Sequence, residues 1–148
     1  MLRCNMKKKL SIFFMFLLLV SSFGYCKVTD SNFEQLKLEL KKEGVSDEFI
    51  KITENSVKRM LTANAKAADI KPVLLDLWKE GVKERALKNA VAAVAELVES
   101  GDNTKDAERI ASGAAHKAEA EGLSGFGVGM RVRKAVKERK AYLKTLKK

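Results

Sequence analysis

Four glycines lie within eight residues near the end of the sequence, in the stretch GLSGFGVGMRVRK (122–134). Closely spaced glycines beside basic residues can cradle a phosphate, because their backbone N–H groups are able to approach the anion. A dinucleotide-binding loop requires a third glycine where Met130 stands, and a Walker-type loop requires lysine after the glycine, whereas a valine follows Gly127. We therefore predict a turn between two helices, at which Arg131 and Arg133 hold an anion only weakly.

Side chains that commonly carry out catalysis or bind metals are scarce. His116 is the only histidine, and Cys4 and Cys26 are the only cysteines. A zinc site therefore lacks ligands, and nothing supports a Ser-His-Asp or Cys-His arrangement. Acidic and basic residues four apart are typical of a solvated helix surface. The sequence predicts no enzyme, no metal and no cofactor, and it places His116 on the partly exposed surface of a helix.

The chain opens with the features of a secretory signal peptide. Three lysines at 7–9 precede the hydrophobic stretch 10–20, and small residues follow. We predict that residues 1–26 direct export and are removed, and the alternative is an uncleaved membrane anchor. Cleavage before Phe23, before Tyr25 or before Cys26 fits the pattern.

Cleavage before Cys26 would give the single remaining cysteine a purpose, since an oxidising compartment normally uses cysteines in pairs. Phe23, Gly24, Tyr25 and Cys26 resemble the lipobox of bacterial lipoproteins in its relaxed, spirochaete-like form, and Tyr25 departs from that pattern. The resemblance covers these four residues. It implies a lipid on Cys26 and a location in the outer membrane or periplasm. Without the lipid, the protein is expected to be periplasmic or secreted.

The remaining residues, 27–148, are enough for a single domain. They contain one proline, Pro72, and many Ala, Leu, Lys and Glu residues, and they show no sustained alternation of apolar and polar positions. These features predict an all-α domain of about six helices. Trp78 follows a run of apolar residues and is predicted to lie in the core.

A short signature, Glu-Gly-Val or Glu-Gly-Leu, recurs at 43–45, 80–82 and 121–123, at intervals of 37 and 41 residues. We predict turns at the three central glycines and three helix–turn–helix hairpins, interpreted as degenerate repeats of about 37–41 residues. The predicted helix starts are Ser31 with Glu34 as a capping box, Ser46 as a cap, Asp69 as a cap with Pro72 in the first turn, residue 83, Asn103 or Thr104, and residues 127–129.

The excess positive charge lies at the C-terminal end. Residues 27–122 contain 16 basic and 18 acidic residues, a net charge of −2, whereas residues 123–148 contain nine basic residues and only Glu138, a net charge of +8. A basic C-terminal helix is predicted over 128–148. The predicted inward-facing stripe of this helix consists of Val128, Val132, Val136, Leu143 and Leu146.

The basic side chains of this helix form the predicted site for an anionic partner. They are Arg131, Arg133, Lys134, Lys137, Arg139, Lys140, Lys144, Lys147 and Lys148. The leading interpretation is a non-enzymatic helical interaction protein of the bacterial cell envelope, exported and either lipid-anchored at Cys26 or free in the periplasm or medium, whose partner is a protein or an acidic polymer. Export argues against nucleic acid as the partner.

The alternative is an adhesin-like surface protein. Its basic helix would bind an anionic polysaccharide, or its terminal lysines, Lys147 and Lys148, would bind lysine-recognising host proteins with kringle-type pockets. The simpler interpretation of the same residues is a packed helix with a solvated basic face.

Replacing Cys26 with alanine tests the predicted lipid attachment. The native protein should partition into detergent, and Cys26→Ala should release it into the soluble fraction, because the thiol is the attachment point. Mass spectrometry of the native N-terminus checks the result, and a mature chain that begins at Phe23 or Tyr25 with a free thiol would contradict it.

Overall fold

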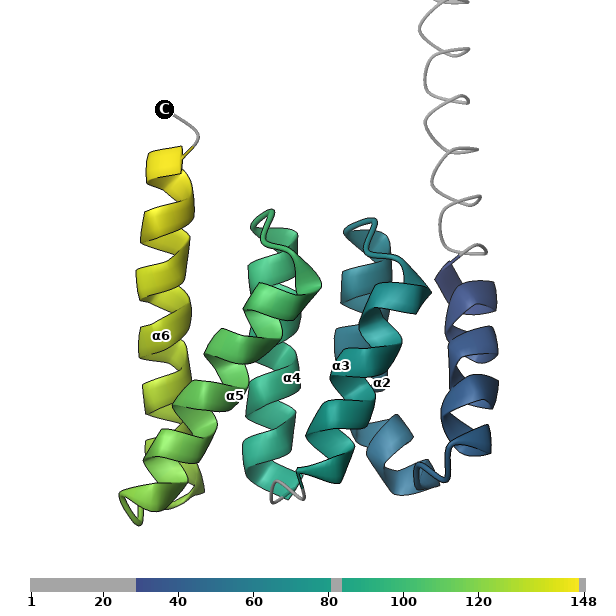
Figure 1. Cartoon of the computed structure of the whole chain (residues 1–148), viewed down its shortest axis with the longest axis horizontal. Coiled ribbons are helices and arrows are strands. Elements are labelled where there is room, and N and C mark those ends of the chain that lie inside the picture. Colours follow the sequence, from purple (N-terminus) through teal and green to yellow (C-terminus); the bar gives the residue numbers. More distant parts are fainter. Residues whose placement is uncertain (1–28, 81–83, 147–148) are drawn as a thin grey trace, which may run out of the picture.

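The computed structural model describes residues 29–80 and 84–146, and within them it contains six helices and no strand (Figure 1). The all-α class is confirmed. The first helix covers residues 29–42. The other five are α2 (Asp47–Thr62), α3 (Ala67–Lys79), α4 (Glu84–Glu99), α5 (Thr104–Ala120) and α6 (Gly125–Leu146).

The helices follow one another along the long axis of the molecule, an arrangement that we call the row, with helix 29–42 at one end and α6 at the other (Figure 1). In this view α3 lies in front of α2, and α5 lies in front of α4. Consecutive helices run in opposite directions, so that the connecting turns alternate between the two ends of the helices. The helix α4 packs against α2, α5 and α6, and α3 packs against α2 and α5. The row therefore has two outer helices, and each of them turns one face away from the core.

The helix α4 supplies a large share of the core. Its buried side chains are Ala86, Leu87, Ala90, Val91, Ala93, Val94, Ala95, Leu97 and Val98. These positions cover more than one face of the helix, which is what a helix surrounded by others requires. On α5, small side chains are buried at the contact with its neighbours, namely Ala107, Ala111, Ala115 and Ala118. Because alanine ends at Cβ, α5 can approach these neighbours closely.

The starts of four helices repeat at an interval of 37 residues. The start of α2 at Asp47 and the start of α4 at Glu84 are separated by this interval, as are the starts of α3 and α5. The two intervening turns also match. Asn64 and Gly101, 37 residues apart, both have positive φ angles (66° and 93°), and each donates its N–H to the carbonyl three residues earlier. These matches support the predicted interval, and the descent of the units from one repeat stays a prediction.

Some of the predicted turns and caps are confirmed. The Ser46 side chain accepts a hydrogen bond from the N–H of Phe49, and the Asn103 side chain accepts one from Asp106. Gly44 and Gly122 have φ angles of +83° and +73°. The third predicted turn glycine, at position 81, lies outside the described residues.

Two predicted helix starts are wrong. Ser31 lies inside helix 29–42, so it is not the residue that caps that helix. The helix α3 begins at Ala67, and the extended residue Lys66 precedes it, so that Asp69 lies in the first turn and Pro72 further along. The carbonyl of Lys66 accepts the N–H groups of Asp69 and Ile70, which starts the helix without a side-chain cap.

The predicted turn before the last helix is too long, because the helix was expected to begin at residues 127–129. The helix α6 begins at Gly125, and of the glycines in this stretch only Gly122 has a positive φ angle. A Cβ atom on Gly129 would lie 3.1 Å from the side-chain nitrogen of Asn89 on α4. The small residue therefore lets the start of α6 pack closely against α4, and packing outweighs the low helix propensity of glycine.

The predicted burial of Trp78 is also wrong. Its side chain is 38% exposed and lies at the edge of the core, where its ring meets that of Phe49 in a T-shaped contact with centroids 5.2 Å apart. The apolar residues before it, Val73, Leu74 and Leu77, take the inward positions of α3. Trp78 follows Leu77 directly, so it lies about 100° further round the helix.

Replacing Gly44 with alanine should destabilise the protein by about 1–2 kcal/mol, because a Cβ atom is strained at a left-handed φ angle. No atom lies within 4 Å of the added Cβ, so the cost comes from the backbone alone. The matched control is Gly113→Ala within α5, which also meets no atom within 4 Å and should stabilise by about 0.5–1 kcal/mol. Urea unfolding of both variants checks the sign, and a stabilising Gly44→Ala would contradict the prediction.

Candidate functional site

The helix α6 closes one end of the row and carries the residues of the predicted site (Figure 1). Val128, Val132 and Val136 are buried and hold its inner face against α4 and α5. Leu143 is half-buried, and Leu146, which was predicted to belong to the same stripe, is 63% exposed. The last turns of α6 extend beyond the neighbouring helices in Figure 1, and Leu146 therefore has no core to enter.

Three of the predicted cations are paired with carboxylates of this chain. Arg131 donates to Glu121 at 2.6 Å, next to the turn that precedes α6. Lys140 donates to Glu96 of α4 at 2.9 Å. Arg139, which is described in the next paragraph, is the third. These side chains serve the attachment of α6 to the rest of the fold.

Arg139 makes the most buried ion pair of this helix. Its guanidinium donates two hydrogen bonds of 2.8 Å to the carboxylate of Asp102, whose side chain is only 2% exposed. The carboxylate also accepts the N–H of Asn103 at 3.1 Å, so the turn between α4 and α5 holds it in place. The hydrogen bonds to Asp102 raise the pKa of Arg139, so this guanidinium stays protonated.

Four other predicted cations form an exposed group on the opposite side of α6. Arg133, Lys134, Lys137 and Lys144 are exposed, and none forms an ion pair with a carboxylate in the described part of the chain. Their spacing of three, four and seven residues places them on neighbouring parts of one face. We call these four residues the outer basic face. Lys147 and Lys148 lie outside the described residues.

Two exposed apolar side chains precede the outer basic face. Phe126 is 76% exposed and Met130 is 53% exposed, and they are one helical turn apart. Leu123, in the turn before α6, is 37% exposed. We call these three residues the apolar patch. The sequence analysis did not identify it, although Phe126 and Met130 both fall outside the valine stripe of the same helix.

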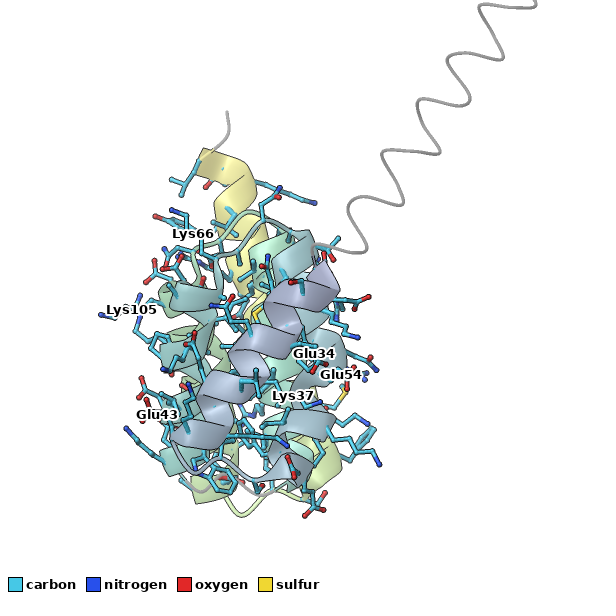
Figure 2. All side chains as sticks on the ribbon, turned by 90° about the vertical axis from the view of Figure 1, so that its right-hand side faces the viewer. Glu34, Lys37, Glu43, Glu54, Lys66 and Lys105 are labelled. Atoms are coloured by element: carbon cyan, nitrogen blue, oxygen red, sulfur yellow. The ribbon has the colours of Figure 1, made fainter. Side chains whose placement is uncertain are left out.

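The charges at the other end of the row are balanced. Figure 2 looks onto this end and shows Glu34 and Lys37 on helix 29–42, with Glu54 nearby. The ion pairs at this end, with their N–O distances, are Lys37–Glu34 (3.5 Å), Lys58–Asp30 (3.1 Å), Lys58–Glu54 (2.9 Å) and Lys41–Asp47 (2.6 Å). The two outer helices therefore present different surfaces. Of the three lysines on helix 29–42 only Lys42 lacks an ion pair among the described residues, whereas four cations of α6 lack one.

An open groove of about 680 Å³ lies between the turn joining α2 to α3 and the turn joining α4 to α5. Asp69, Asp76 and Glu108 supply carboxylates to its wall, and Lys105 lies at the same site. Partial burial raises the pKa of Glu108, and the nearby carboxylates of Glu80 and Asp76 raise it further. This groove is acidic and so cannot attract the same partner as the outer basic face.

His116 is exposed on α5, as predicted, and its Nε2 lies 2.8 Å from the Glu80 carboxylate beyond the end of α3. Within residues 29–80 and 84–146, no cluster of three His, Cys, Asp or Glu side chains is arranged to hold a metal ion. None of the helices in those same ranges has both the length and the hydrophobicity to cross a bilayer. Cys26 lies outside the described residues.

Comparison of the chain with protein families, with curated proteins and with solved structures finds no match. The case for a function therefore depends on the surfaces described above.

Replacing Glu108 with glutamine should stabilise the protein at neutral pH. Folding raises the pKa of Glu108, so the folded state favours the protonated form, and the charged carboxylate becomes unfavourable as pH rises through the folded pKa. Glutamine removes the charge and can still accept the hydrogen bond that Ser112 donates to Glu108 at 3.4 Å. The variant should melt at a higher temperature than the parent at pH 7.

The difference in melting temperature should disappear below pH 4.5, the ordinary pKa of a glutamate, where both side chains are neutral. Thermal unfolding followed by circular dichroism at both pH values makes the comparison. A gain of the same size in acid would mean that charge repulsion at Glu108 is not the cause.

Proposed function

We propose that this protein is a non-enzymatic interaction protein of the bacterial cell envelope, exported, lipid-anchored at Cys26, and binding an anionic partner through the outer basic face of α6. One observation carries the proposal. Arg131, Arg139 and Lys140 are neutralised by carboxylates of the same chain. The outer basic face, Arg133, Lys134, Lys137 and Lys144, has no such partner among the described residues.

The arrangement favours recognition of a charged surface over recognition of a small molecule. The outer basic face lies along one helix, α6, at the end of the row (Figure 1). Cations on such a face bind an extended array of negative charges by releasing its counterions. A small anion is held better by convergent donors, which this face does not provide.

Fixed attachment of α6 also supports a role in binding. The three buried valines hold the inner face of α6 against the core, and the buried Arg139–Asp102 pair sets the rotation of the helix about its own axis, so that the same side faces outward. The four cations are therefore presented together, and binding requires little ordering of the backbone.

Neutralising the outer basic face should abolish most binding to an anionic polymer. The test variant carries Arg133→Gln, Lys134→Gln, Lys137→Gln and Lys144→Gln. It should elute from a heparin column at much lower salt than the parent, since each contacting cation contributes about one unit to the slope of log K against log salt.

The matched control removes the same charge elsewhere, with Lys42→Gln, Lys51→Gln, Lys79→Gln and Lys88→Gln. These lysines are exposed and, like the test residues, form no ion pair within the described ranges. The control should elute close to the parent. Equal losses in the two variants would mean that net charge alone causes retention, and the proposal would fail.

A further inference from the structure

The apolar patch next to the outer basic face is not explained by attraction to an anion. Phe126 and Met130 expose 76% and 53% of their surfaces, although the core of α4, α5 and α6 is close by. Solvent exposure of large apolar side chains is unfavourable, and clusters of them on a surface commonly mark an interaction site.

Charge and apolar surface share one side of α6. Phe126, Met130 and Lys134 follow each other at intervals of four residues, and Lys137 and Lys144 continue the same face. From Phe126 to Lys144 this surface is about 27 Å long, given the rise of an α-helix. Glu138 is the only acidic residue of α6.

We infer that this side of α6 docks onto an anionic phospholipid bilayer, with the apolar patch inserted at the level of the headgroups. The inference rests on the proposed function and identifies its partner. Amphipathic helices that lie on membranes combine aromatic or aliphatic side chains with lysine and arginine on the adjoining surface. The cations of the outer basic face would contact lipid phosphates, and each adds to the attraction of an anionic leaflet.

Charge complementarity and position favour a bilayer over a soluble polymer. A sulfated polysaccharide would use the four cations but would leave Phe126 and Met130 in water. A membrane surface uses both groups at once. The patch also lies where the chain turns from α5 into α6, and this turn is at the α6 end of the row (Figure 1).

Sedimentation with vesicles separates this inference from the proposed function. All variants carry Cys26→Ala, so that a lipid on that residue contributes nothing, and the probes are vesicles of phosphatidylcholine alone or with phosphatidylglycerol at a molar ratio of about three to one. The parent should bind the anionic vesicles and not the neutral ones. Neutralising the outer basic face should weaken binding by about two to three orders of magnitude.

The decisive variant is Phe126→Ser with Met130→Ser. It keeps every cation, so heparin retention should be unchanged, whereas partitioning onto anionic vesicles should fall at least about tenfold. Leu38→Ser, which replaces a 61% exposed leucine on helix 29–42, serves as the control and should bind like the parent. Circular dichroism verifies that each variant folds.

Insertion can also be observed directly. In a Trp78→Phe background, Phe126→Trp should show quenching by brominated phospholipid, whereas Trp78 of the parent, on α3, should show none. If the serine variant keeps its vesicle binding, or the new tryptophan is not quenched, the membrane inference is wrong. If heparin binding persists in that case, the proposed function survives with a soluble anionic partner. If neutralising the cations leaves both kinds of binding intact, both proposals fail.

Discussion

The need to bury α4 determines how the other helices are arranged around it. Its apolar positions occupy more than one face, from Ala86 to Val98, so this helix cannot lie at the surface without exposing core residues to water. The helices α2, α5 and α6 cover it on different sides. Because α6 packs on α4, one set of α6 side chains faces inward. The remaining side chains of α6 form its outer face and determine the chemistry of that face.

Attachment of α6 combines apolar and ionic contacts in a way that sets its orientation. Three valines, each one turn from the next, form a narrow inner stripe on α6. Because these side chains are small and alike, they do little to fix the rotation of α6 about its own axis. Arg139 and Lys140 bind carboxylates on the α4–α5 turn and on α4, at Asp102 and Glu96. Because the Asp102 carboxylate is buried, moving Arg139 away would leave an unpaired charge, so the ionic contact specifies one rotation.

Local signals predicted much of the fold. The caps Ser46 and Asn103 are correct, because each depends on neighbours within a few residues. The predicted start at residue 83 lies outside the described residues, directly before Glu84, the first described residue of α4. The start of α3 was missed because Asp69 and Pro72 resemble a helix start, while the extended residue Lys66 takes that position without a side-chain cap. The predicted start of α6 is wrong because the spacing of the glycines does not indicate that Gly129 packs against Asn89 of α4.

The division of the basic residues could not be predicted from the sequence. Arg131, Arg139 and Lys140 find carboxylates 10, 37 and 44 residues away, and only the arrangement of the helices brings these partners together. From the sequence alone, the nine cations therefore form a single group. The exposure of Phe126 and Met130 has the same origin, since a helical pattern indicates which residues share a face but not whether another helix covers it.

The charge of the molecule is also distributed unevenly along its long axis. Residues 27–122 carry a net charge of −2 and residues 123–148 one of +8, and the helix that bears most of the positive charge stands at one end of the long axis. Such a distribution is an electric dipole along that axis. In the field of an anionic surface it exerts a torque that turns the α6 end forward before any contact forms, within about a Debye length, or 8 Å at physiological salt. A larger share of diffusional encounters would then begin with the correct end facing the partner, and this advantage would decline as salt shortens the range of the field.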